Sequence, residues 1–187
     1  MTAVEPALAP STRLAVREDV GRLADLYGAA LGELAPMRGG RALLGLNGRS
    51  IPVANSFLDQ LDDPARRLVV GLLGADLVGY GSCRTYVLSG AGGRPVSAGP
   101  AQDHDPRAER LGAIDELYVL AEARRCGVGR VVAASLLDWC RSLGCTGVDA
   151  SALPGSRAVK SFFESEGFTA RLLVMHRPLA QPAPGIG

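Results

Sequence analysis

Hydrophobic positions in the first part of the chain repeat with the periods of one strand and two helices. Residues 12–17 alternate between apolar and polar side chains, which predicts an opening strand. Asp19 is of a type favoured at helix N-caps and predicts the start of a helix. Residues 53–61 predict a second helix that ends before Pro64, whereas residues 36–48 are broken by glycines and predict no element. The first helix has an apolar stripe at helical spacing, formed by Val20, Leu23, Ala24, Tyr27, Leu31 and Leu34.

The middle of the chain has the composition of strands. Residues 67–73 and 77–87 are rich in Val, Leu and Tyr, and the short segment between them predicts a tight turn, so the two form a hairpin. Residues 88–110 contain Gly, Pro, Ser and charged residues without an apolar period, which predicts a mobile surface loop inserted in the domain. Residues 111–120 predict a further strand. The insert precedes this strand and could gate a nearby site, although an insertion without a role fits the pattern equally well.

Helices and strands alternate in the last part of the chain. Residues 146–152 predict a strand, Ser156 is expected to cap the helix that follows, and residues 168–176 predict a final strand. Before them lies a longer helix, which Gly144 is expected to end. Its apolar stripe, including a tryptophan expected in the core, consists of Val128, Val132, Leu136, Trp139 and Leu143.

The order of these elements predicts an α/β fold in which helices flank a mixed sheet. A chain of 187 residues with 47% hydrophobic content can bury one good core. We therefore expect a single domain over residues 12–179, with the insert at 88–110. Residues 1–11 and 180–187 are rich in Ala, Pro or Gly and are expected to be disordered tails.

Residues 114–130 carry the most specific signal in the chain. The segment reads as a strand, a short polar loop and two glycines, Gly127 and Gly129, at the start of an apolar helix. A helix N-terminus has free backbone N–H groups and a partial positive charge, and glycines allow a ligand to come close to them. The segment therefore predicts a backbone cradle for a phosphate or pyrophosphate group.

Two other phosphate-binding motifs fit this segment less well. A P-loop requires Lys and then Ser or Thr after its last glycine, whereas Arg130 and Val131 stand there. A dinucleotide fingerprint is closer, because Asp149 lies roughly 20 residues beyond Gly129, where that motif places an acidic residue. Its third glycine would fall at Val132, however. A nucleotide-binding oxidoreductase fragment is therefore the least favoured alternative.

The pattern Arg124-x-x-Gly127-x-Gly129, after a strand that ends in Leu-Tyr-Val, resembles the acyl-CoA loop of the GCN5-related N-acetyltransferases, the GNAT superfamily. The resemblance is strongest over residues 111–178. It implies a GNAT-like fold, in which two central parallel strands splay apart, and acetyl-CoA as co-substrate. The strand would bind the pantetheine arm, and the loop and helix would bind the pyrophosphate. The expected cofactor-binding residues are Leu117, Tyr118, Val119, Arg124, Arg125, Cys126, Gly127, Val128, Gly129, Arg130 and Ser156.

Amine acylation needs a base or a water chain that removes a proton from the attacking nitrogen. The resemblance implies that an acidic residue just before the Leu-Tyr-Val segment faces the acceptor amine, which makes Asp115 and Glu116 the candidate catalytic residues. Strand alternation would send their side chains to opposite faces, unless a bulge at this point redirects them. We favour Asp115 over Glu116. Solvation of either carboxylate, or its pairing with an arginine, is the alternative.

The chain departs from the family pattern at Phe163. Relatives often have a tyrosine there that protonates the departing thiolate, and a phenyl ring has no proton to give. Two functions follow from the resemblance. The first is direct acetyl transfer, in a ternary complex, to a primary amine of a small molecule or a protein. The second is a non-catalytic acyl-CoA-binding regulatory module with the same fold.

Composition limits the partners and the location. The net charge is +1 without a basic block, so we expect no binding to nucleic acid or an anionic membrane, and no apolar run is long enough to span a bilayer. The first residues lack the features of a secretory signal. Four cysteines without a Cys-x-x-Cys pair, with only two histidines, predict reduced thiols and no metal site. We expect a cytoplasmic protein, and family analogy suggests a homodimer without fixing the oligomeric state.

Overall fold

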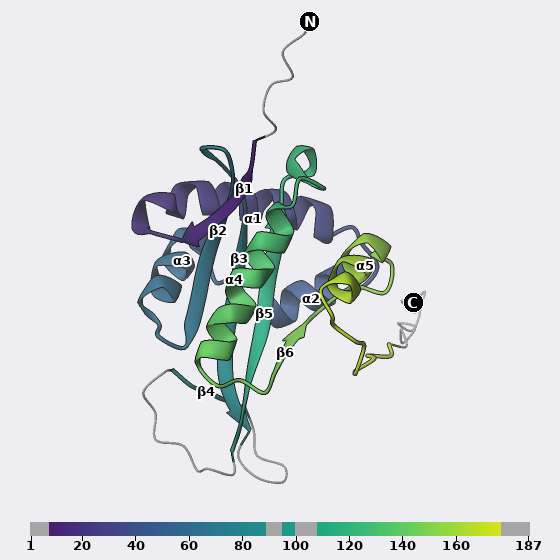
Figure 1. Ribbon diagram of the computed structural model, residues 1–187. Coiled ribbons are helices and arrows are strands. Elements are labelled where there is room, and N and C mark those ends of the chain that lie inside the picture. Colours follow the sequence, from purple (N-terminus) through teal and green to yellow (C-terminus); the bar gives the residue numbers. More distant parts are fainter. Residues whose placement is uncertain (1–7, 89–94, 100–107, 177–187) are drawn as a thin grey trace, which may run out of the picture.

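The computed structural model describes residues 8–88, 95–99 and 108–176, and these form one mixed sheet with helices on both faces (Figure 1). The strands are β1 (Pro10–Leu14), β2 (Arg66–Leu73), β3 (Asp76–Leu88), β4 (Val96–Ser97), β5 (Glu109–Val119) and β6 (Gly147–Ala150). Their order is β1-β2-β3-β5-β6, and β4 pairs with the end of β3. Neighbours are antiparallel except for β5 and β6, which are parallel.

Helices cover the two faces of the sheet unequally. They are α1 (Val20–Leu34), α2 (Gly40–Asn47), α3 (Val53–Asp62), α4 (Val128–Ser142) and α5 (Arg157–Ser165), with single 3-10 turns at Arg17–Asp19 and Ala121–Ala123. Helix α4 crosses one face, where Phe163 of α5 joins the same core, and α1 and α3 cover the other face (Figure 1). The arrangement confirms the predicted α/β fold class.

Strand β2 shows how the sequence builds the two cores. Its residues alternate between the faces of the sheet. Val69 belongs to the core under α4, whereas Leu68 and Val70 belong to the core under α1 and α3. Trp139 lies in the core under α4 and is only 7% exposed, as its place in the helical stripe predicts.

Two glycines bring α4 close to the sheet. A Cβ atom on Gly71 would lie 2.6 Å from Val128, and a Cβ atom on Gly81 would lie 2.5 Å from Val132. Contacts this short do not occur between real side chains, so both positions require glycine while α4 stays where it is. The start of α4, and with it the glycine-rich loop, is therefore fixed against β2 and β3.

The two parallel strands separate part of the way along β5. Pairing begins at Leu111 with Gly147 and ends at Ile114 with Ala150, after which β5 continues to Val119 without β6. This confirms the splayed central strands. The backbone edge of β5 beyond Ile114 is therefore open toward the place where β6 would have continued.

The predicted hairpin and the main helices are confirmed, but the final strand is wrong. Residues 168–176 form no strand, and residues 172–175 are exposed. A strand needs a neighbour whose backbone completes its hydrogen bonds, and local composition does not supply one. The opening strand begins at Pro10 and ends at Leu14, earlier than its alternation indicates. Helix α2 lies in the segment for which no element was predicted, because its glycines sit mainly at its ends.

The insert at 88–110 contains more regular structure than its composition indicates. Strand β3 extends to Leu88, β5 begins at Glu109, and β4 pairs through Val96 and Ser97 with the end of β3. Ala98 beside it is fully buried. The rest of the predicted loop, residues 89–94 and 100–107, lies outside the described residues, as do residues 1–7 and 177–187 of the predicted tails.

Two predicted caps lack their hydrogen bonds. Asp19 precedes α1, but its carboxylate accepts hydrogen bonds from Arg13 and from the Val16 backbone N–H. The arginine holds the pKa of Asp19 below its ordinary value. Ser156 stands at the N-cap of α5, and its side chain makes no capping bond. The residue types therefore predicted correctly where these helices start, but not which hydrogen bonds the two side chains make.

Candidate functional site

The loop between β5 and α4 leaves a row of backbone N–H groups free. Arg125 and Gly127 have positive φ angles of 64° and 87°, and these left-handed conformations lead the chain into the first turn of α4. Among the described residues, no acceptor lies within hydrogen-bond distance of the amides of residues 125–129. The helix dipole adds positive potential at the same place. The segment, called the cradle below, thus has the geometry of an anion-binding site.

The arginine side chains beside the cradle are bonded to protein groups. Arg124 donates to the Val119 carbonyl at 2.9 Å and to both carboxylate oxygens of Glu33 at 2.7 and 2.8 Å. Tyr118 donates to the same carboxylate, and partial burial together with this bond raises the pKa of Tyr118 to about 12. Arg130 donates to a carboxylate beyond α5 at 2.9 Å. These contacts hold the loop against α1 and α5 and leave the free donors to the backbone.

Helix α5 closes the other side of the cradle. A Cβ atom on Gly129 would lie 3.5 Å from the Phe162 ring, an ordinary contact, so the two helices lie close together here without requiring glycine at this position. Phe163, at the usual tyrosine position, is 8% exposed, and its ring lies 5.1 Å from that of Phe168. Phe163 therefore packs in the core. Cys126 in the cradle is exposed.

A bulge in β5 places both candidate carboxylates in one cavity. Ser82 pairs with Glu116 and Cys83 pairs with Ile114, so Asp115 has no partner across the strand pair. This extra residue changes the alternation, as the sequence allowed. Asp115 and Glu116 both line a cavity of about 290 Å³ between the sheet and the segment that joins α2 to α3. The bulge that the sequence left open as an alternative is present here.

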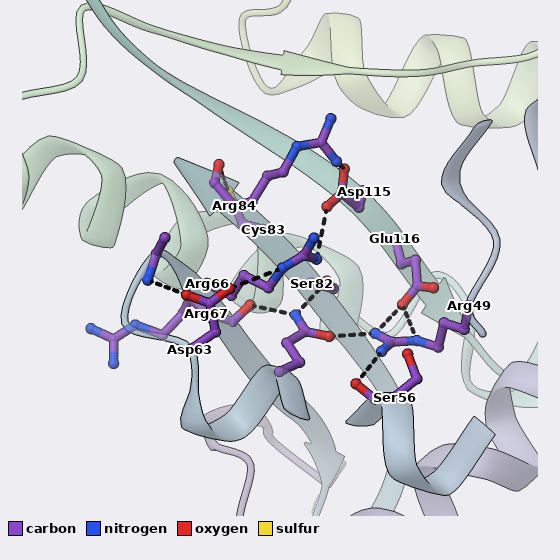
Figure 2. Close-up of polar contacts among 12 residues, drawn as sticks. Arg49, Ser56, Asp63, Arg66, Arg67, Ser82, Cys83, Arg84, Asp115 and Glu116 are labelled. Carbon is purple, nitrogen blue, oxygen red and sulfur yellow. Dashed lines mark hydrogen bonds and ion pairs between the residues drawn. The ribbon is translucent and has the colours of Figure 1, made fainter. Parts of the chain in front are cut away.

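Glu116 is held in a buried ion pair. Arg49 donates from Nε and Nη2 to Oε2 of Glu116, at 3.1 and 2.6 Å, and the two side chains are 7% and 12% exposed. The Arg49 guanidinium also lies 3.6 Å from the centre of the Phe57 ring. It donates to Gln60, which donates to the Ser82 hydroxyl (Figure 2). Burial raises the pKa of Glu116, and the charge of Arg49 opposes this shift. Glu116 is therefore bonded to Arg49 within this network rather than free to accept a proton from a substrate.

Asp115 keeps one carboxylate oxygen free. Arg84 donates to Oδ1, and Arg66 Nη1 lies 3.6 Å from Oδ2, an ion-pair distance too long for a hydrogen bond (Figure 2). Oδ2 is buried and has no hydrogen-bond partner in the part of the chain that the structure describes. Burial raises the pKa of Asp115, while Arg84 and Arg66 pull it down less strongly. A buried carboxylate oxygen without a donor is costly, so it is suited to a ligand N–H.

Sequence reasoning missed the partners of these carboxylates. They come from the α2–α3 segment, from α3, β2 and β3, and no local motif marks them. Only the general preference of buried carboxylates for arginine points to them. The missed residues are Arg49, Gln60, Arg66, Ser82 and Arg84.

Asp149, the acidic residue that the dinucleotide motif would use, lies outside this cavity. Tyr86 donates to it at 3.1 Å, and Arg171 pairs with it at 3.1 Å. Within residues 8–88, 95–99 and 108–176, no three His, Cys, Asp or Glu side chains are grouped to hold a metal ion. No helix in these same ranges is long and apolar enough to cross a bilayer.

Comparison with known proteins identifies the family. The model of the acetyltransferase (GNAT) family matches residues 45–168, which is more than half of the chain and includes both the cavity and the cradle. The chain belongs to the GNAT acetyltransferase family. Acetyl transfer is therefore the general activity that the fold and the family support. No curated protein sequence matches the chain.

Solved structures share the fold at low sequence identity. A transcriptional regulator from Bacillus halodurans C-125 is 18% identical with a TM-score of 0.62, over 90% of this chain and 99% of that one. An acetyltransferase from Trypanosoma brucei is 22% identical with a TM-score of 0.59, over 91% and 99%. AAC(6')-Iy, solved with the bisubstrate analogue CoA-S-monomethyl-acetylneamine, is 13% identical with a TM-score of 0.62, over 91% and 99%.

Proposed function

We propose that this protein transfers an acetyl group from acetyl-CoA directly to a primary amine of a small molecule or a protein, in a ternary complex. The observation that carries the proposal is the buried, unpaired Oδ2 atom of Asp115 in the same strand that leads into the cradle. Strand β5 thus connects the proposed proton acceptor, Asp115, with the backbone amides of the cradle. A cytoplasmic location and a homodimer stay part of the proposal, on composition and family analogy.

The residues at the C-terminal end of β5 fit acetyl-CoA as substrate. The free amides of residues 125–129 suit a pyrophosphate, because they have no acceptor among the described residues and lie at a helix N-terminus. Residues 117–119 lie beyond the last pair with β6, so their backbone can bond an extended pantetheine arm. Ser156 stands at the start of α5, with its hydroxyl free of a capping bond. The side chains of Arg124 and Arg130 support the loop from outside.

Asp115 is the proposed base. The attacking amine donates a proton to Oδ2, and its nitrogen forms a bond to the acetyl carbon while the bond from that carbon to sulfur breaks. The raised pKa of Asp115 makes it a stronger base than an exposed aspartate. A backbone N–H near Val119 can stabilise the oxyanion. Phe163 gives no proton, so the thiolate leaves unprotonated or takes a proton from water.

The second candidate is a module that binds acyl-CoA without catalysis. Phe163 favours it, because its ring is packed in the core and offers no acid to the leaving group. Both candidates bind CoA through the cradle. They differ in whether CoA thiol is released when an amine is added.

Thermal melting with acetyl-CoA, CoA, NAD and NADP tests the binding step. A ligand present at about 100 times its dissociation constant stabilises the folded protein by roughly 2.7 kcal/mol, a readable rise in melting temperature. We expect a rise with acetyl-CoA and CoA and none with NAD or NADP. An amine panel with detection of free thiol then separates the two candidates. A protein that melts at the same temperature with and without CoA species would contradict both.

A further inference from the structure

We infer that the amine acceptor is a small zwitterion whose carboxylate binds Arg66 and Arg84 while its amine faces Asp115. The inference rests on the proposed function and goes beyond it by assigning the chemical class of the acceptor. It is carried by the donors and charges that line the cavity beside the β5 bulge.

Two half-exposed guanidinium groups converge on one buried carboxylate. Arg66 and Arg84 are 36% and 37% exposed, whereas Asp115 between them is 8% exposed (Figure 2). Among the described residues, Arg84 makes one hydrogen bond, to Oδ1 of Asp115. Arg66 lies 3.4 Å from a carboxylate oxygen of Asp63 and 3.6 Å from Asp115, without a hydrogen bond to any described residue. Most of their N–H donors are therefore free on the cavity wall.

Arg49 shows the contrast within the same cavity. Its guanidinium bonds Glu116 and Gln60 and stacks on Phe57, so its donors are occupied and its charge is neutralised. A planar guanidinium binds carboxylates through paired N–H groups. Arg66 and Arg84 are the guanidinium groups of this cavity that keep such pairs available.

The free guanidinium donors, rather than the net charge, favour a zwitterion over a simple amine. Arg66 and Arg84 are matched by Asp63 and Asp115, Arg49 is matched by Glu116, and Asp59 adds one further negative charge to the lining. An acceptor with one ammonium and one carboxylate adds no net charge to the cavity and can bond both kinds of free group. Its carboxylate would bond the free guanidinium donors, and its amine would bond Oδ2 of Asp115. A cationic amine without an anionic group would instead meet two guanidinium groups that it cannot bond.

The size of the cavity points the same way. About 290 Å³ is at the lower end of the range for ligand pockets, roughly 300–1,000 Å³. This volume suits an amino acid or a similar short amino carboxylate better than a large polyamine.

Matched acceptors test the inference directly. The rate of CoA thiol release would be measured with glycine against glycinamide and with β-alanine against β-alaninamide. The amide lacks the negative charge of the acid. Its amine is also less basic, so a larger fraction of it is neutral and ready to attack at the same pH. A preference for the acid must therefore come from its carboxylate. We expect the acid to exceed the amide in kcat/KM by roughly tenfold or more. A ratio near or below one in both pairs would overturn the inference.

Variants locate the effect. Arg66→Gln and Arg84→Gln should each bring the acid-to-amide ratio toward one, mainly by raising KM for the acid. Taking the ratio removes any change in the base strength of Asp115 that the variants cause. Arg67→Gln is the control, because Arg67 adjoins Arg66 in β2 but its guanidinium lies 5.3 Å from the Trp139 ring. An unchanged ratio in both cavity variants, or an equal loss in the control, would contradict the assignment.

A binding measurement separates this inference from the proposed function. Calorimetric titration of β-alanine into the protein with CoA needs no turnover, and we expect heat in the wild type and in Arg67→Gln but not in Arg84→Gln. Absence of heat in the wild type overturns the zwitterion. Acetylation of amines without a carboxylate, at the same rate as the amino acids, would contradict the zwitterionic acceptor but not acetyl transfer. Binding of the acid without any thiol release would instead contradict acetyl transfer but not the binding site.

Discussion

The cradle at the start of α4 and the cavity at the β5 bulge offer different parts of the chain to a ligand. In the cradle, the free donors are the backbone amides of residues 125–129, and the neighbouring Arg124 is turned toward Glu33. In the cavity, the free groups are side-chain atoms, namely the guanidinium donors of Arg66 and Arg84 and the Oδ2 atom of Asp115.

This difference determines which substitutions each region tolerates. A backbone site is sensitive to Cβ atoms, charge and φ angles at its glycines and tolerates changes in the side chains around it. A side-chain site is sensitive to each functional group and to the buried contacts that hold it. Five predictions test this division, beginning with the largest effect.

Gly127→Glu should remove acetyl-CoA binding. The substitution puts a carboxylate into the anion cradle at a φ of 87°, and we expect affinity to fall by roughly 100-fold or more, at least about 2.7 kcal/mol. Gly144→Glu is the control, because Gly144 follows the other end of α4, with a φ of 73° and nothing close to its Cβ position. Calorimetric titration with acetyl-CoA compares the two. Equal affinities in the two variants would mean that the cradle is not the binding site.

Asp115→Asn should act on the rate without affecting the cradle. Loss of a general base lowers kcat by about 10²- to 10⁴-fold, while affinity for acetyl-CoA stays the same. Asp149→Asn is the control, because Asp149 bonds Tyr86 and Arg171 outside the cavity. A variant at position 115 with wild-type kcat would show that another group removes the proton.

The pH profile of Asp115 has a defined sign. Activity requires the carboxylate, so the rate should rise with pH through a limb above about 3.9, the ordinary aspartate value, because burial raises this pKa. The asparagine variant should lack that limb. Stability changes in the opposite direction, since the folded protein binds this proton more tightly than the unfolded chain. Asp115 therefore lowers stability as pH rises from its ordinary pKa through the raised one.

Glu116→Gln should act mainly on stability. Breaking a buried ion pair leaves Arg49 uncompensated and costs about 3–5 kcal/mol, measured by denaturant unfolding. Arg49→Met combined with Glu116→Gln should cost less than the two single changes together. Asp62→Asn, which breaks the exposed pair with Arg17, should cost no more than about 1 kcal/mol. A loss at Glu116 as small as at Asp62 would show that the Arg49 pair does not hold the cavity together.

The same division explains what the sequence could predict. The cradle was predictable because its glycines, the strand before it and the helix after it are consecutive in the chain. Arg49 and Arg66 come from segments far from Asp115, and no spacing rule connects them with it. The bulge could be named only as an alternative, because residues 114–116 alone read as a regular strand. A bulge depends on how a strand pairs with its neighbour in the sheet, which local sequence does not show. Residues 168–176 were wrongly predicted as a strand for the same reason, because they have no neighbouring strand to pair with among the described residues.

Arg124→Met tests the backbone character of the cradle with the smallest expected effect. Arg124 and Glu33 are 44% and 47% exposed, and a surface pair of this kind contributes about 0.2–1 kcal/mol. Its loss should therefore change acetyl-CoA affinity by less than about fivefold. Glu33→Gln breaks the same pair from α1 and should give a matching change, because both variants loosen the loop without touching its amides. If Arg124→Met instead weakens binding as strongly as Gly127→Glu while Glu33→Gln does not, the arginine side chain leaves Glu33 to bind the phosphate itself. The cradle would then depend on side chains, as the cavity does.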